Sequence, residues 1–138
     1  MNPYYPQVAL RAGHRCEYCH APEAVFNLPL EVEHIVPIAR GGEETTANWA
    51  LACRACNLYK ATHVSGSDPE SKAVVRLFHP RADQWKDHFH VAPESGEIVG
   101  RTPIGRATIA RLGINSAAQV AARQQWMRLG LFHEANMT

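Results

Sequence analysis

The chain has 138 residues, which is enough for one domain or for a core with an appended subdomain. Its hydrophobic content of 46% is typical of a globular protein and predicts a modest buried core. No apolar run is long enough to span a membrane, and the first residues lack the pattern of a secretory signal. We therefore expect a soluble, cytoplasmic protein without a membrane partner.

The formal net charge of +1 hides an asymmetry along the chain. Residues 1–97 carry nine lysines and arginines against twelve acids, whereas residues 98–138 carry five arginines against one acid. The basic end is a candidate surface for a polyanion such as nucleic acid. An ordinary solvated face would have the same composition, so charge alone does not decide between the two.

The N-terminal segment, residues 1–13, is expected to form a helix or an irregular arm. It leads into the only cysteines of the chain, which are spaced as two Cys-x-x-Cys pairs: Cys16, Cys19, Cys53 and Cys56. A two-residue spacer lets both sulfurs of a pair reach one metal ion, so the two pairs predict a structural zinc with four thiolate ligands. Disulfides are the competing interpretation, but no secretory signal supports them. A redox Cys-x-x-Cys would explain only one pair.

The middle of the chain alternates short strands and loops. Residues 28–42 are apolar and β-branched before Pro37 and the diglycine Gly41-Gly42, which indicates a strand that enters a loop. Residues 49–53 predict a second short strand. A helix is then expected from Cys53 or Arg54 to about Thr62, because this segment contains no helix breaker.

The remaining chain predicts an extension with a hairpin and two helices. Residues 66–71 have the composition of a turn, and a hairpin is expected around residues 94–96. Thr102-Pro103 is a favourable helix start, and that helix should end at Gly113. Asn115 or Ser116 can cap a last helix that runs to Leu129. We therefore divide the chain into a core, residues 1–65, and an extension, residues 66–138.

Four side chains of the core suit phosphodiester hydrolysis. Glu33 and Asn57 offer hard oxygen ligands that suit Mg²⁺ or Mn²⁺. His34 can accept a proton from water near neutral pH. Lys60 lies one helical turn after Asn57, on the same predicted helix face, where it could contact a phosphate. A divalent ion, a base and a cation are the groups that this reaction needs.

The run EHIVPIARGG, residues 33–42, followed by NWALACRACNLYK, residues 48–60, resembles the HNH (ββα-metal) endonuclease family in its branch with cysteine knuckles. The three signature positions are His34, Asn48 and Asn57, which makes this an HNN variant. The resemblance covers residues 16 to about 63. The rest of the chain also resembles the tails of stand-alone bacterial HNH proteins, to which we assign no function.

This resemblance implies an α+β fold: a ββα-metal core with a zinc site, followed by the extension. It implies that Glu33 and Asn57 ligate the catalytic ion, that His34 activates the attacking water, and that Asn48 braces the loop and helps to hold the histidine. Structural zinc would be bound by the four cysteines. The implied reaction is hydrolysis of DNA, nicking or cutting both strands, to give 5′-phosphate and 3′-hydroxyl ends. Asn57 stands where many members have histidine, which favours Mg²⁺ or Mn²⁺ at that position.

Alternatives remain open at this point. The same core could be a non-catalytic zinc-stapled module that binds DNA, or it could cut RNA, and the chain could be a monomer or a homodimer. Neighbouring residues of a regular strand point to opposite faces, so Glu33 and His34 face one site only if the strand is irregular there. Double-stranded DNA is the expected partner, and we expect Arg101, Arg106 and Arg123 of the extension to contact its phosphates.

Overall fold

The structure is a computed structural model, and it describes residues 1–132. Residues 133–138, the end of the predicted extension, lie outside the described part. The elements are, in chain order, α1 (Tyr5–Arg11), η1 (Glu23–Val25), β1 (Glu31–His34), η2 (Ile38–Arg40), η3 (Thr46–Asn48), β2 (Trp49–Ala52), α2 (Arg54–Lys60), β3 (Ser65–Ser67), β4 (Val74–Arg76), α3 (Trp85–His88), β5 (Phe89–Val91), β6 (Ile98–Gly100), α4 (Pro103–Leu112) and α5 (Ala117–Arg128). No helix in residues 1–132 is long and apolar enough to cross a membrane.

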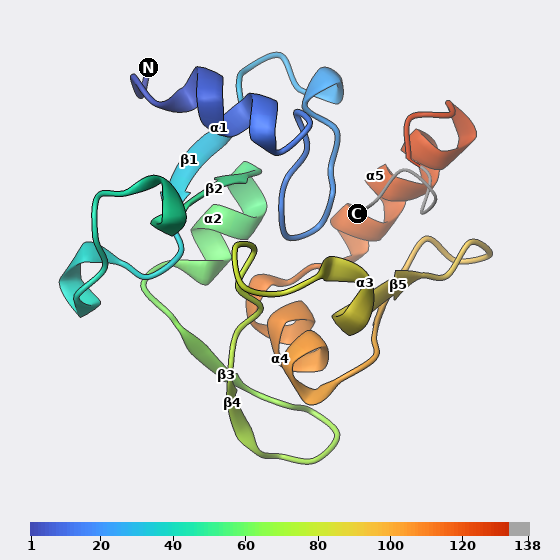
Figure 1. Ribbon diagram of the computed structural model, residues 1–138. Helices are drawn as coiled ribbons and strands as arrows, with labels where there is room; N and C mark the ends of the chain where they lie inside the picture. The colour runs from blue at the N-terminus through green and yellow to red at the C-terminus, as the bar shows by residue number, and fades with distance from the viewer. Residues whose placement is uncertain (133–138) are drawn as a thin grey trace.

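Strands β1 and β2 and helix α2 form the ββα unit that the sequence predicts. The two strands pair antiparallel, with Glu31 opposite Ala52 and His34 opposite Trp49. Cys53 then caps α2 by accepting a hydrogen bond from the backbone N–H of Cys56. Helix α2 packs against β1, and Figure 1 shows this unit next to α1. The predicted fold class, α+β with a small ββα core, is confirmed.

The loop between β1 and β2 depends on its two glycines. Gly41 has a φ of +87°, in the left-handed region that glycine adopts without steric cost. At Gly42 a Cβ atom would lie 1.8 Å from the backbone oxygen of Val36, so any side chain there would push the two ends of the loop apart. The diglycine therefore allows the chain to fold back close to Val36.

Helix α4 lies at the centre of the extension and contacts α2, β3, β4 and β6 (Figure 1). Its start and end are as predicted: Thr102 accepts a hydrogen bond from the N–H of Gly105, and Gly113 ends the helix with a φ of 60°. Ser116 caps α5 in the same way. These caps are local in sequence, which explains why the residue types alone locate both helices.

The buried side chains of the two segments form one hydrophobic cluster. Leu51 of β2 belongs to the same cluster as Phe78, Phe89 and Leu112 from the chain after residue 65. Phe78 and Phe89 pack edge to face with ring centroids 5.2 Å apart. Residues after 65 thus contribute to the packing that holds the ββα unit in place.

Candidate active site and zinc site

The two cysteine pairs converge in the fold. Cys16 and Cys19 lie in the turn after α1, and Cys53 and Cys56 lie at the start of α2. All four residues are buried and unlinked by disulfides, and their sulfurs lie within 4.8 Å of one another. Because a zinc ion binds thiolates at about 2.3 Å in a tetrahedron, its four sulfurs lie about 3.8 Å apart. The distance of 3.7 Å between the sulfurs of Cys19 and Cys53 fits that arrangement.

Two of the cysteine sulfurs accept hydrogen bonds from backbone N–H groups. The N–H of Cys19 points at the sulfur of Cys16, and the N–H of Cys56 points at the sulfur of Cys53, each at 3.5 Å. Hydrogen bonds from Cys16 and Cys19 hold the pKa of the Cys53 thiol well below its ordinary value. Burial raises the pKa of the Cys16 thiol, and hydrogen bonding to the other cysteines raises that of Cys56, so a bound cation such as zinc is what would hold all four sulfurs as thiolates. The donor set therefore fits structural zinc.

Asn48 ties together the two ends of the loop between β1 and β2. Its side-chain oxygen accepts a hydrogen bond from the N–H of Val36 at 2.8 Å. Its amide nitrogen donates to the backbone oxygens of Val36 and Glu43, each at 2.9 Å. Asn48 is buried, with 8% of its surface exposed, and its side-chain amide is engaged in these three hydrogen bonds. Its position explains how the loop after His34 is held in one conformation.

His34 is the last residue of β1, and its side chain reaches the surface. The ring nitrogen Nε2 is bonded to the carboxylate of Glu44, which lies in the loop that Asn48 braces. This hydrogen bond from His34 lowers the pKa of Glu44. A third of the His34 side chain is exposed. If Nε2 carries the proton donated to Glu44, then Nδ1 is the ring atom that can accept one.

Glu33 points the other way, into the protein. Only 5% of its surface is exposed. One carboxylate oxygen accepts a hydrogen bond from the hydroxyl of Tyr18, and the other lies 3.2 Å from the ammonium of Lys60. Burial raises the pKa of Glu33, although the positive charge of Lys60 acts in the opposite direction. Strand β1 is regular here, so Glu33 and His34 face opposite sides, as the alternation of side chains in a strand requires.

Two expectations from the sequence are therefore corrected. Lys60 does not contact solvent or a phosphate: it is 2% exposed, and its ammonium also donates to the backbone oxygens of Ile35 and His34, at 2.8 and 3.3 Å. Both oxygens of Glu33, expected to share an ion with Asn57, are instead engaged by Tyr18 and Lys60. Lys60 sits on the expected helix, but its long side chain turns inward to the end of β1.

Asn57 has a different acidic neighbour. Its amide nitrogen donates to a carboxylate oxygen of Glu31 at 2.7 Å, across the contact between α2 and β1. The other oxygen of Glu31 lies 3.2 Å from Arg54, whose side chain is 80% exposed. Glu31 and Asn57 thus bring a carboxylate and an amide together near the surface, which is a pair of oxygen donors that suits a hard divalent ion.

The arginines of the extension are mostly engaged inside the protein. Arg123, expected to contact DNA, is 1% exposed and donates to the backbone oxygens of Gly96 and Ile114, so it is not on the surface. Arg106 forms a two-point ion pair with the buried Asp68 and is not a free cation, which also departs from the expectation. Arg101 is exposed and donates to one backbone oxygen. The amphipathic pattern of α4 could not reveal these partners, because they come from distant segments.

The comparison with protein families agrees with this geometry. Residues 16–62 match the family model of the HNH endonucleases. This stretch carries the HNH motif. It runs from the first cysteine pair through β1, the braced loop and β2 to the end of α2, and it comprises about a third of the chain. The family resemblance predicted from the sequence is confirmed over the HNH stretch. No curated protein and no solved structure matches the chain.

Sequence reasoning did not single out three residues of the HNH stretch that the fold brings into contact with its signature positions: Tyr18, Glu31 and Glu44. Glu31 could have been found, because it lies two residues before Glu33 and shares a strand face with it. Tyr18 and Glu44 carry no such signal, since they reach their partners only through the turn and the loop.

Proposed function

We propose that the protein is a metal-dependent endonuclease that hydrolyses phosphodiester bonds of DNA and leaves 5′-phosphate and 3′-hydroxyl ends. The observation that carries this proposal is the pair of His34 and Glu44 at the open end of β1, inside the HNH stretch. A surface histidine that is oriented by a carboxylate is the usual form of a general base.

In the proposed mechanism, Glu44 fixes the His34 ring by accepting the hydrogen bond from Nε2. Nδ1 of His34 then removes a proton from the attacking water. The water oxygen forms a bond to phosphorus, the bond from phosphorus to the 3′ oxygen breaks, and that oxygen takes up a proton from a solvent water molecule. Asn48 holds the loop so that Glu44 stays beside His34. A divalent ion would supply positive charge for the phosphate, and Glu31 and Asn57 would be its protein ligands. Because Glu31 shares the strand face of Glu33, this ion would approach the phosphate from the side of β1 opposite to His34.

Replacing His34 by alanine should lower the cleavage rate by about 10² or more, the usual scale for the loss of a general base. The measurement is conversion of supercoiled plasmid to nicked and linear forms in the presence of Mg²⁺ or Mn²⁺. His14→Ala is the matched control, since His14 is an exposed histidine whose partner is Glu23. A His34→Ala protein that cleaves like the parent would rule out this mechanism. Preferential cleavage of structured RNA would reassign the substrate.

Replacing Asn57 by alanine or Glu31 by glutamine should raise the Mg²⁺ or Mn²⁺ concentration needed for half-maximal cleavage. We expect about tenfold or more, because even indirect partners of metal ligands change affinity by about 10- to 100-fold. The measurement is the cleavage rate as a function of metal concentration.

The discriminating control is the double variant Glu33→Gln/Lys60→Met, which removes both charges of the buried pair. Its metal requirement should stay close to that of the parent, since Glu33 faces Lys60 and Tyr18. A raised requirement in this variant, together with a parental requirement in Glu31→Gln, would identify Glu33 as the ligand and exclude Glu31.

A further inference from the structure

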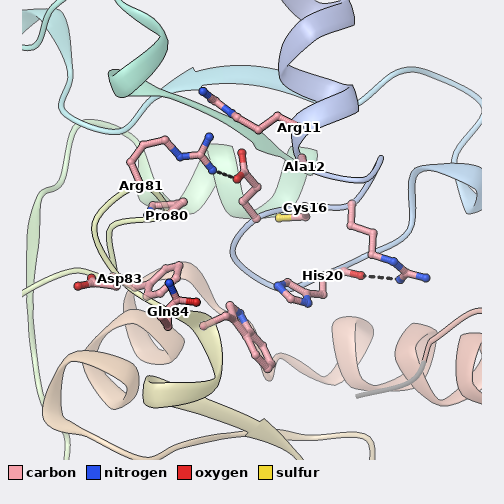
Figure 2. Close-up of a pocket in the computed structure, with 12 residues that line it drawn as sticks. Arg11, Ala12, Cys16, His20, Pro80, Arg81, Asp83 and Gln84 are labelled. Atoms are coloured by element: carbon pink, nitrogen blue, oxygen red, sulfur yellow. Dashed lines mark hydrogen bonds and ion pairs between the residues drawn. The ribbon is translucent and has the colours of Figure 1, made fainter. Parts of the chain in front are cut away.

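A polar cavity lies next to Cys16 of the first cysteine pair. It is a cavity of about 240 Å³ between the end of α1, the turn after it, and residues 80–85. Figure 2 shows the ends of the Arg11 and Arg81 side chains close together at one edge of this space, with His20 at another wall. Since a water molecule occupies about 30 Å³ in the liquid, the cavity can hold a phosphate group with its neighbouring atoms.

The positive charge of this cavity is not fully compensated. Arg11 donates only to backbone oxygens, those of Thr46 at 2.9 Å and Trp49 at 2.7 Å. Arg15, another residue that lines the cavity, also donates only to backbone oxygens, those of His20 and Leu131. Neither arginine forms an ion pair with an acid in residues 1–132.

The two acids that line the cavity are already paired. Glu17 binds Arg81 and also accepts a hydrogen bond from the N–H of Leu51 at 2.8 Å. Asp83 forms a two-point contact with Arg76. With both carboxylates used in this way, the charges of Arg11 and Arg15 remain available to an anion from outside.

Two buried polar atoms at the cavity have no hydrogen-bond partner within the described part of the chain. One is Nη1 of Arg81, which can only donate, and the other is Nδ1 of His20. His20 is about nine-tenths buried, and its ring stacks on Trp85 with the centroids 4.3 Å apart. Buried polar atoms are normally satisfied, and both of these unsatisfied atoms belong to residues that line the cavity.

The two guanidinium groups also affect each other. Burial and the nearby charge of Arg11 lower the pKa of Arg81 to about 10. Like charges that face one cavity repel each other unless an anion lies between them. Guanidinium groups bind phosphate through several parallel hydrogen bonds, which makes a phosphate an anion that suits two neighbouring arginines.

We propose that the cavity between Arg11 and Arg81 binds a backbone phosphate of the nucleic acid that His34 cleaves. This inference rests on the proposed function, and the fold supports it, because Arg11 holds the backbone of Trp49, the residue paired with His34. A nucleic-acid strand bound in this cavity would pass the start of β2, at Trp49, on its way to the catalytic histidine. Arg11 and Arg81 thus replace Arg101, Arg106 and Arg123 as the principal contacts to the substrate backbone.

The test is equilibrium binding of a fluorescent DNA duplex in the His34→Ala background without added divalent ions, so that the result does not depend on cleavage. Arg81→Gln should weaken binding roughly tenfold, because hydrogen bonds to charged groups are stronger than neutral ones. The plot of log affinity against log salt concentration should become flatter by about 0.9 per lost phosphate contact. Glutamine keeps an amide that can still donate to Glu17.

The matched control is Arg128→Gln, which removes the same charge from an exposed position on α5 and should bind almost like the parent. Inorganic phosphate should raise the melting temperature of the parent more than chloride does at equal ionic strength, and Arg81→Gln should lose this effect. The measurement on the parent needs no variant, so that half of the test remains informative if Arg81→Gln folds poorly.

The outcomes separate the two proposals. Equal duplex binding by the Arg81→Gln and Arg128→Gln variants would overturn the backbone-phosphate site. If phosphate still stabilised the parent, the cavity would then be a site for a free anion. Absence of both effects would leave no anion site at all. Weakened duplex binding by Arg81→Gln in a protein that does not cleave any nucleic acid would uphold the cavity and refute the nuclease.

Discussion

Replacing Cys53 by serine should give a protein that contains little zinc and is largely unfolded at room temperature. The free energy of zinc binding to four-ligand sites is about 10–16 kcal/mol in small peptides. Whole domains are stable by only about 5–15 kcal/mol, so the loss of one ligand removes a large part of the total. Cys53 also caps α2, and its sulfur accepts a hydrogen bond from the N–H of Cys56. The measurements are elemental analysis and circular dichroism.

The control is the parent protein treated with a strong chelator and then given zinc again. Chelation should produce the same loss of structure, and added zinc should restore the melting transition. The Cys53→Ser variant should not recover on addition of zinc. Full zinc content and an unchanged melting temperature in this variant would show that the four cysteines do not form a metal site.

Local sequence patterns predict much of this fold. The order of cysteine pair, strand, loop, strand, cysteine pair and helix follows from short-range signals such as Gly41-Gly42 and the spacing of the cysteines. The start of α4 at Thr102-Pro103 and its end at Gly113 follow from capping preferences that involve adjacent residues. Each of these features depends on residues that are close in sequence, so their types alone are informative.

Contacts between distant segments could not be read in the same way. Lysine and arginine are mostly exposed in proteins, so a surface position was the natural expectation for Lys60 and Arg123. Both are buried because the fold surrounds them with backbone oxygens: those of His34 and Ile35 for Lys60, and those of Gly96 and Ile114 for Arg123. A side chain of this length can reach either solvent or buried backbone oxygens, and the tertiary structure determines which of the two it contacts.

The acidic residues of the candidate site illustrate the same limit. The period of two along a strand already separates Glu33 from His34, and the structure follows that rule. The sequence motif places Glu33 and His34 side by side, yet it carries no information about which acid lies opposite Asn57. That pairing depends on how α2 lies across β1, and it brings Glu31 to Asn57.

Replacing Lys60 by methionine should lower the free energy of unfolding by about 3–5 kcal/mol at neutral pH, the usual cost of leaving one buried charge without its partner. Glu33 would then keep only the hydroxyl of Tyr18. The double variant Glu33→Gln/Lys60→Met should recover most of this loss, because it leaves no buried charge. The measurement is denaturant unfolding of the parent, the single variant and the double variant at equal zinc content.

The pH dependence of this effect has a definite sign. The folded-state pKa of Glu33 is raised by burial, so the folded protein binds a proton more readily than the unfolded chain does. Such a group favours folding below its ordinary pKa, and this contribution is lost as the pH rises through the raised value. Without Lys60 the pKa of Glu33 must rise further, since the charge that lowered it is gone. The difference in stability between the parent and Lys60→Met should therefore shrink as the pH falls toward the ordinary range of a glutamate. Both proteins keep the four cysteines, so acid weakens zinc binding in each, and the difference between them isolates Glu33. A difference that stays constant with pH, or a double variant no more stable than Lys60→Met, would mean that the Glu33–Lys60 pair does not hold α2 to the end of β1.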